Sequence, residues 1–408
     1  MMAKRDKRVY GQFNTQYEPG VDMRRLRYER LDRVQAEMAA RGYGALLLSD
    51  NRNVRYCTGV AVMPIWSAIN LAHYVLVPVE GSPILYEYGH ALHRAEHFWD
   101  QVRPVKYHHA HWADDLADEL SGQWAAEIKD ILQEWGVADA KLGLDIMDFE
   151  GFVALQGQGL NLADADSVME EARIIKTMDE IELLRQSATV TEACLHEMQT
   201  AIRPGITENE LMGVYWERML AAGGEFCSTR LLVSGYKTNP WFHEAGSKMV
   251  RPGDLVAIDT DMTGPEGYLC DISRTFLCGD KPTPTQKEAY QVAYDFVMAT
   301  IELCKPGISF AELAAEAPQF PEDYKAQRYP LILHGIGLDD EPPNIVFPDR
   351  VKGPRPEGIL KENMVVAVEA YAGKVGAQDG VKLEEEVWIT AEGPVVISLY
   401  PYEDKLLL

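Results

Sequence analysis

The sequence predicts a mixed α/β fold of the α+β kind, divided into more than one domain. Its 408 residues predict two domains, or three, because a domain usually holds about 100–200 residues. Strand-like runs alternate with helical patterns up to about residue 170. A long helix with its own start motif then opens a second region. We therefore expect an arm at 1–23, a smaller domain at 24–170 and a larger domain at 171–408.

The elements of the smaller domain follow from their periodicity. The polar segment 1–23 is expected to lie on another surface. Leu31, Val34 and Met38 then share one helical face, and Gly42 is the expected helix stop. A further helix is expected at about 113–135, and strands at Ala45–Leu48, Tyr74–Pro78, Pro83–Tyr88 and in KLGLDI, residues 141–146.

The larger domain opens with a helix and contains a weak internal repeat. Thr177 and Glu180 form a capping box (S/T-x-x-E) at the helix start. Residues 203–211 read RPGITENEL and residues 305–313 read KPGISFAEL. Each has a Pro-Gly turn, an Ile, a Thr or Ser cap and a Glu three residues later. Either the half-domain is duplicated around a pseudo-twofold core, with one cluster of ligands in each half, or helix starts simply look alike.

Composition excludes several functional classes. Lys plus Arg is 39 and Asp plus Glu is 63, and the net charge of −24 argues against a nucleic-acid partner. No apolar run approaches the length of a membrane-spanning helix. The segment MMAKRDKRVYGQFN lacks the apolar centre of a secretory signal, and the six cysteines contain no CxxC pair. The expected location is therefore a reducing cytoplasm.

Three carboxylates cluster around one apolar strand. Leu255–Ile258 leads into Asp259 and Asp261, which would share one face of an extended chain. A Gly-Pro turn follows, and an antiparallel return would bring Asp271 beside the first pair. Buried carboxylates need a positive partner, which is either Arg274 or a metal ion.

Three later segments favour the metal. His334 follows an apolar strand, Glu369 lies in MVVAVEA, and in KLEEEVWIT Glu384 and Glu386 share one face while Glu385 takes the other. Singly, each of these residues is as easily a surface carboxylate or a salt-bridge partner. Together, one imidazole with hard oxygen ligands suits two divalent transition-metal ions: manganese, iron, cobalt or zinc. The candidate metal ligands are Asp259, Asp261, Asp271, His334, Glu369 and Glu384.

With these residues in place, the sequence resembles the pita-bread metallohydrolases, which include methionine aminopeptidase, Xaa-Pro aminopeptidase, prolidase and creatinase. The dinuclear ligands of that family occur in the chain order Asp, Asp, His, Glu, Glu. Matching stretches here carry Asp259, Asp271, His334, Glu369 and Glu384. The resemblance spans roughly 20–400 and implies a small creatinase-like N-terminal α/β domain before a pseudo-twofold pita-bread catalytic domain. It also implies a homodimer in which the partner's N-terminal domain closes the pocket.

Two departures separate the sequence from the peptidases. Asp261 adds a carboxylate where peptidases usually have a Gly or another small residue. Peptidases also carry a second His about seven positions after the ligand His, where it steadies the tetrahedral intermediate. Here Asp340 and Glu341 stand at that place, and acids would repel an oxyanion. Both departures recur in the dimethylsulfoniopropionate (DMSP) lyase branch, which the phrases IDTDMTGPEGYLCDISRTF and VKLEEEVWIT also resemble.

The lyase branch implies a β-elimination that yields dimethyl sulfide and acrylate, with iron as the favoured metal. Metal bound to the substrate carboxylate would stabilise the developing charge. Asp340 is the implied base, because nearby acids and reduced contact with water raise a carboxyl pKa toward a useful range. The alternative for Asp340 is a loop or capping residue.

Aromatic side chains would bind the sulfonium cation of such a zwitterionic small-molecule substrate. Trp66, Trp241 and Tyr329 are the candidates, of which Trp66 and Tyr329 match pocket positions of the lyase branch; each is otherwise a core residue. Trp66 is expected to reach the partner's pocket. His243 matches the pocket histidine of the peptidases and favours a hydrolase. The hypotheses are therefore a DMSP lyase, an Xaa-Pro dipeptidase or related amidohydrolase, and a non-catalytic binding protein.

Overall fold

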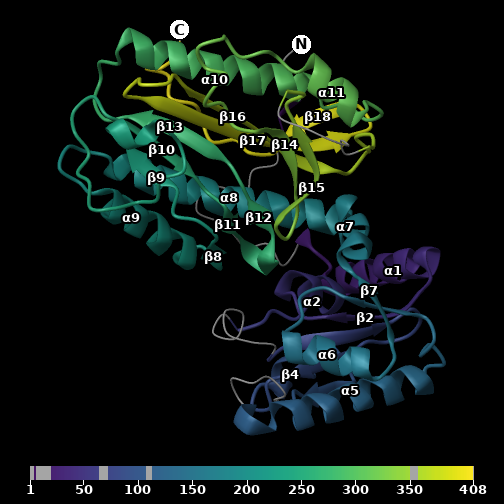
Figure 1. Ribbon diagram of the computed structural model, residues 1–408. Coiled ribbons are helices and arrows are strands. Elements are labelled where there is room, and N and C mark those ends of the chain that lie inside the picture. The colour runs from purple at the N-terminus through teal and green to yellow at the C-terminus, as the bar shows by residue number, and fades with distance from the viewer. Residues whose placement is uncertain (1–3, 6–19, 64–71, 107–112, 350–356, 408) are drawn as a thin grey trace. The chain divides into compact units, whose positions relative to one another are not determined.

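The computed structural model describes residues 4–5, 20–63, 72–106, 113–349 and 357–407 (Figure 1). The chain forms two compact units. One spans Asp22–Arg173, and the other spans Ile174–Leu408 together with the short strand β1 (Lys4–Arg5). None of the helices in these described ranges is long and apolar enough to span a membrane.

In its described residues, the smaller unit is a six-stranded sheet packed against helices. Its strand order is β5-β4-β3-β2-β6-β7, in which β2, β6 and β7 are parallel and β3 is antiparallel to β2. Trp124 reaches from α5 into the core and donates its indole N–H to the hydroxyl of Tyr74. The elements are α1 (Met23–Arg41), β2 (Tyr43–Leu48), α2 (Asn51–Thr58), β3 (Tyr74–Pro78), β4 (Ile84–Glu87), β5 (Val102–Pro104), α5 (Ala117–Glu134), β6 (Lys141–Leu144), α6 (Phe149–Gly157), β7 (Asn161–Asp164) and α7 (Asp166–Ile174).

Local sequence rules set the ends of the helices. Asp22 caps the start of α1 by accepting the backbone N–H groups of the first turn. Gly42 ends the helix with a φ of 75°, a left-handed conformation that glycine adopts without strain, so the predicted stop is confirmed. The predicted capping box of Thr177 and Glu180 is also present at the start of α8.

Where the structure describes it, the larger unit combines one six-stranded sheet with two three-stranded sheets. The strand orders are β1-β18-β17-β16-β14-β15, β13-β10-β9 and β12-β11-β8. Its elements are α8 (Met178–Ala201), α9 (Glu208–Ala221), β8 (Phe226–Cys227), β9 (Leu232–Ser234), β10 (Leu255–Asp259), β11 (Met262–Thr263), β12 (Leu269–Cys270), β13 (Ser273–Leu277), α10 (Pro284–Leu303), α11 (Phe310–Glu316), β14 (Leu331–Ile336), β15 (Asp340–Val346), β16 (Val365–Gly373), β17 (Gly380–Thr390) and β18 (Gly393–Val396).

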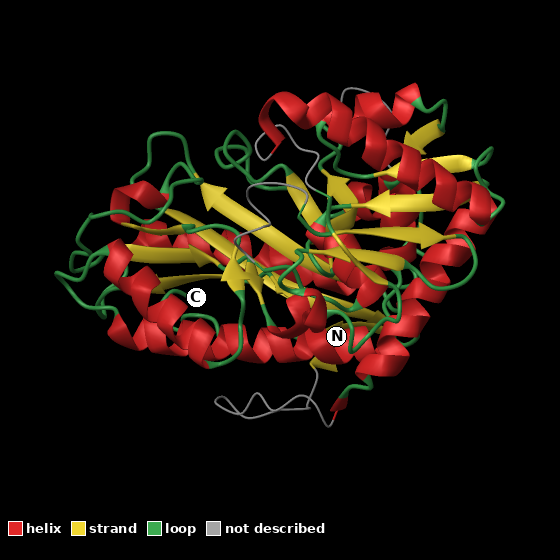
Figure 2. Ribbon diagram, turned by 90° about the horizontal axis from the view of Figure 1, so that it is seen from below, coloured by secondary structure: helices red, strands yellow, loops and turns green. Residues whose placement is uncertain are grey.

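Each half of this unit has its own apolar core. Helices α8 and α9 pack with β9–β13, whereas α10 and α11 pack with β14, β16 and β17. Figure 1 shows α10 running along the face of β16 and β17. Figure 2 shows the helices (red) and strands (yellow) of the chain from below. The halves meet where the Thr275 hydroxyl of β13 accepts the backbone N–H of Lys382 in β17 and donates to its carbonyl.

The two Pro-Gly segments of the sequence repeat occupy equivalent places in the two halves. Thr207 caps α9 and Ser309 caps α11, and in each case the Glu three residues later completes a capping box. Thr207 forms an isolated β-bridge with Met249, as Ser309 does with Ile359. The Gly of each Pro-Gly turn donates its N–H to the carbonyl one residue past the bridge partner. This shared pattern favours a duplicated half-domain over a chance likeness of helix starts.

Candidate active site

Side chains from both halves of the larger unit converge on one cluster. The first half contributes two aspartates, one at the end of β10 and one between β12 and β13. The second half contributes a histidine and two glutamates from β14, β16 and β17. Overlapping groups of these residues bring ligand atoms within 4.8 Å of one another: Asp259, Asp271 and Glu384; His334, Glu369 and Glu384; and Asp271, His334 and Asp340. The antiparallel return that was predicted to bring Asp271 beside Asp259 is confirmed.

Asp261 is held beside this cluster rather than within it. The strand ends at Asp259, and Asp261 has a φ of 34°, so the two side chains do not follow the alternation of an extended chain. The expectation of a shared strand face was wrong for that reason. The Asp261 carboxylate accepts a hydrogen bond from Thr229, and its backbone N–H reaches Oδ1 of Asp271 at 3.4 Å. Burial raises the pKa of the Asp261 carboxyl to about 6.

The atoms at the centre of the cluster fit a bound cation. Nε2 of His334 lies 3.4 Å from Oε1 of Glu384, 3.8 Å from Oε1 of Glu369 and 3.7 Å from Oδ2 of Asp271. Within the described part of the chain, neither glutamate Oε1 atom accepts a hydrogen bond. Two atoms that each bind an ion at about 2.0–2.2 Å are at most about 4.4 Å apart, so these spacings suit a shared metal ion.

A buried lysine that the sequence interpretation missed lies among the same carboxylates. Nζ of Lys382 is 3.1 Å from Asp259, 3.0 Å from Glu369 and 3.1 Å from Glu384. It also donates to the hydroxyl of Ser273, which itself donates to Asp259 and Glu384. Lys382 lies two positions before Glu384 on the same strand face, a spacing that would have revealed it. One ammonium group does not neutralise this many carboxylates, so the cluster favours further cations.

The pKa shifts express the same excess of negative charge. Burial raises the pKa of Glu369 to about 8, although Lys382 opposes the shift. Burial alone would lower the pKa of His334, but the carboxylates of Glu384, Glu369 and Asp340 outweigh it and raise the pKa to about 10. The Glu384 pKa is lowered, because Lys382 and His334 outweigh burial. A proton on His334 or a metal ion therefore serves the same electrostatic need.

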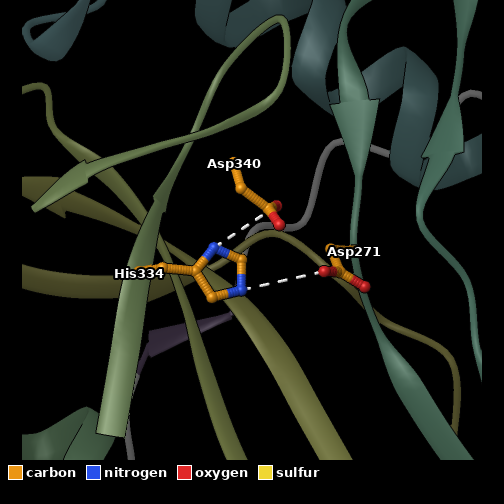
Figure 3. A group of neighbouring side chains, drawn as sticks. All are labelled: Asp271, His334 and Asp340. Atoms are coloured by element: carbon orange, nitrogen blue, oxygen red, sulfur yellow. Dashed lines mark ion pairs between the residues drawn. The ribbon is translucent and has the colours of Figure 1, made fainter. Parts of the chain in front are cut away.

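Asp340 lies on the open side of the cluster, whereas the neighbouring acid does not. Figure 3 shows the imidazole of His334 between Asp340 and Asp271. Oδ1 of Asp340 is 3.5 Å from Nδ1 of His334, and its side chain is 54% exposed. Partial burial raises the pKa of Asp340, while His334 opposes that shift. Glu341 is buried and pairs with Lys176 at 2.9 Å, so only one of the two acids predicted here faces the cluster.

The sequence left open whether Arg274 or a metal ion compensates the negative charge of the aspartates, and Arg274 does not. Its guanidinium is fully buried and pairs with Glu385 at 3.0 Å. Glu385 faces the opposite side of β17 from Glu384 and Glu386, as the alternation of the strand predicts. Glu386 instead accepts the backbone N–H of Asp271 at 3.0 Å and so helps to fix that aspartate in place.

The three aromatic residues that were predicted to contact the substrate differ in where the structure places them. Tyr329 is half-buried, and its ring centroid lies 4.9 Å from Nζ of Lys382, at the edge of the cluster. Trp241 is buried in a small core, with its ring 5.9 Å from that of Tyr371. Tyr329 packs against the same small core, so Trp241 lies within that core rather than on an open face. Trp66 lies outside the described residues.

The residues after Trp241 point outward. Phe242 is exposed, and its ring centroid lies 5.5 Å from that of Tyr329. His243 is exposed as well, and none of the groups of possible metal ligands among the described residues includes it. The exposed aromatic residue beside Tyr329 is thus Phe242, which the sequence interpretation did not select.

Comparison with known proteins places this geometry in a family. Residues 182–391, just over half of the chain, match the model of metallopeptidase family M24. The chain belongs to metallopeptidase family M24. Residues 30–175 of this M24 chain match the creatinase/prolidase N-terminal domain. The two matches confirm the predicted fold class, a small creatinase-like domain followed by a pita-bread domain.

Named relatives of this M24 chain include both lyases and peptidases. Dimethylsulfoniopropionate lyase DddP of Roseovarius nubinhibens is 30% identical over 399 residues, which cover 95% of this chain and 88% of the relative. Xaa-Pro dipeptidase of Pyrococcus furiosus is 30% identical over 234 residues, 56% of this chain and 64% of the relative. Among solved structures, Xaa-Pro dipeptidase from Bacillus anthracis has a TM-score of 0.75 at 23% identity, over 93% of this chain and 99% of that one. This last likeness concerns the fold alone.

Proposed function

We propose that this protein is a metal-dependent lyase that cleaves DMSP into dimethyl sulfide and acrylate by β-elimination. The placement of Asp340 carries the proposal. Its exposed carboxylate lies beside the metal-ligand candidate His334, while Glu341 is buried in an ion pair. The similarity to the lyase DddP over almost the whole chain supports the same reading.

The metal centre would take the substrate carboxylate. The proposed ligands within the cluster are Asp259, Asp271, His334, Glu369 and Glu384. Asp261, beside the cluster, is proposed as a sixth ligand. When bound, two divalent ions, with iron favoured by the resemblance, would stabilise negative charge that develops on the substrate carboxylate. Lys382 holds Asp259, Glu369 and Glu384 in place before any ion binds, which reduces the repulsion among them.

Asp340 would act as the base. Its carboxylate removes a proton from the carbon next to the substrate carboxylate, and the electron pair of that C–H bond forms the C=C bond of acrylate. The C–S bond breaks at the same time, and sulfur keeps its electrons and leaves as neutral dimethyl sulfide. The proton stays on Asp340 until water removes it, for which the exposed side chain is suited.

Amide hydrolysis is the alternative, and the Xaa-Pro dipeptidase relatives favour it. Hydrolysis passes through a tetrahedral oxyanion that a neutral or cationic donor must stabilise. Here the position seven residues after His334 is Glu341, whose carboxylate is already paired with Lys176. The cluster is better equipped to remove a proton than to stabilise an oxyanion.

The expected homodimer belongs to this proposal, and light scattering would show twice the chain mass of 45.8 kDa.

The test is headspace gas chromatography of dimethyl sulfide released by the metal-replete protein from DMSP, beside an assay of Gly-Pro and Ala-Pro cleavage. Asp340→Asn should lower the rate of elimination by about 10²- to 10⁴-fold, the usual contribution of a general base, and leave the metal content unchanged. The matched control is Asp339→Asn, the adjacent acid, which should keep most of the activity. Near-full activity of Asp340→Asn would show that another group is the base. Proline release without dimethyl sulfide would instead identify a dipeptidase.

A further inference from the structure

Phe242 occupies an unfavourable position for an aromatic residue. Its φ of 69° lies in the left-handed region, which bulky side chains rarely adopt, and 62% of the residue is exposed. The residue before it, Trp241, is buried in the small core with Tyr371. The strained backbone thus sends one ring into the core and the next ring outward. Such strain is characteristic of functional sites.

The outward ring continues an aromatic path from the carboxylate cluster. The rings of Phe242 and Tyr329 lie with centroids 5.5 Å apart and planes inclined by 31°. The ring of Tyr329 in turn faces Nζ of Lys382 at 4.9 Å. Because Lys382 and Phe242 already lie against Tyr329, the larger open aromatic face in this pair belongs to Phe242.

We infer that Phe242, with Tyr329 behind it, binds the cationic head group of the substrate and selects zwitterions over neutral acids; this inference rests on the proposed function. The face of an aromatic ring attracts a cation, and onium groups with methyl substituents are well matched to it. The neighbouring cluster is rich in carboxylates, so it also favours a positive over a neutral group. The substrate would lie with its carboxylate toward the metal ligands and its onium group on Phe242.

Two substrate analogues separate cation recognition from simple apolar contact. 3-(Trimethylammonio)propanoate carries a cationic head, and 4,4-dimethylpentanoate has the same shape with a neutral carbon at its centre. Both would be titrated into the metal-replete protein by calorimetry. Phe242→Leu should weaken binding of the cationic analogue by about 3- to 30-fold, the range of a cation–π contact. Binding of the neutral analogue should stay within about twofold, because leucine keeps most of the apolar surface. Phe242→Tyr should restore affinity for the cation.

The matched control is Phe226→Leu. Phe226 is also an exposed phenylalanine, 53% accessible, and its ring lies against Trp216 at 5.8 Å. Both analogues should bind this variant as they bind the wild type. If Phe242→Leu weakened the binding of both analogues equally, or weakened neither, the role of Phe242 would be overturned. Dimethyl sulfide release by the wild type would still support the lyase in that case. A wild type that binds neither analogue and releases no dimethyl sulfide would overturn both.

Discussion

The ion pair between Lys176 and Glu341 gives a stability prediction that also tests the position of the base. Nζ of Lys176 lies 2.9 Å from Oε2 of Glu341, and the two side chains are 1% and 2% exposed. Glu341 also accepts the backbone N–H of Leu338 at 3.2 Å, so its carboxylate lies under the turn that leads to Asp340. We predict that Lys176→Met destabilises the protein and slows elimination together.

The magnitude follows from the burial of both groups. Methionine fills most of the volume of the lysine stem but removes the Lys176 ammonium from the Glu341 carboxylate, and breaking a buried pair in this way costs about 3–5 kcal/mol. The double variant Lys176→Met/Glu341→Gln removes both charges and keeps an amide oxygen for the Leu338 N–H. It should recover most of the lost stability, because replacing both partners of a buried pair is often close to neutral.

Urea unfolding followed by tryptophan fluorescence would measure these differences at fixed metal concentration. Dimethyl sulfide release would report on Asp340 in the same preparations. Lys248→Met is the control, since it breaks a different ion pair, a partly buried one with Asp254 at 2.7 Å, that does not adjoin the carboxylate cluster. This control should lose stability and keep its kcat. Our reasoning would be refuted if Lys176→Met unfolded at the same urea concentration as the wild type and eliminated at the same rate.

Two further predictions concern pH and metal. Burial raises the pKa of Glu192 from 4.5 to about 7, so the folded protein keeps a proton that the unfolded chain releases, and stability falls as pH rises across that window. Glu192→Gln lacks this titration, so it should be more stable than the wild type by about 1–3 kcal/mol at pH 8 but not at pH 4.5. Urea unfolding would measure both differences. The same difference at both pH values would contradict the raised pKa of Glu192. Removal of metal by a chelator should lower the melting temperature, because ligand at 1,000 times its Kd stabilises a protein by about 4 kcal/mol, and divalent iron or manganese should restore it. His334→Ala should retain less metal by mass spectrometry, and the chelator should lower its melting temperature by less. If the wild type kept its melting temperature after complete metal removal, the stabilising role of the metal would be contradicted.

Much of the site could be predicted because its side chains follow local rules. The apolar run before Asp259 identified a buried strand, and the two-residue period of β17 separated Glu384 and Glu386 from Glu385. Capping boxes likewise marked the start of α8 and the repeated entries into α9 and α11. In each case a few neighbouring residues determine the local structure, so the sequence alone is sufficient.

The parts that could not be predicted depend on contacts distant in sequence or on backbone conformation. Lys176 pairs with Glu341 across 165 positions, and nothing near either residue indicates the other. Phe242 adopts a left-handed φ and is exposed beside the buried Trp241, and a non-glycine residue gives no sign of such a φ. The early end of β10 displaced Asp261 in the same way.

The direct pairing of Glu369 with Glu384 in the β16–β17 ladder has a consequence for how the site can be altered. Like charges opposite each other weaken a sheet, yet each of these glutamates is matched by Lys382, and the next residue, Glu385, is matched by Arg274 on the reverse face. Sliding β17 by one residue would exchange its faces and break both charge matches at once. The positions of the charged side chains in the site therefore depend on the register of β16 and β17. Insertions in the loop between these two strands should be tolerated far better than any change within the strands.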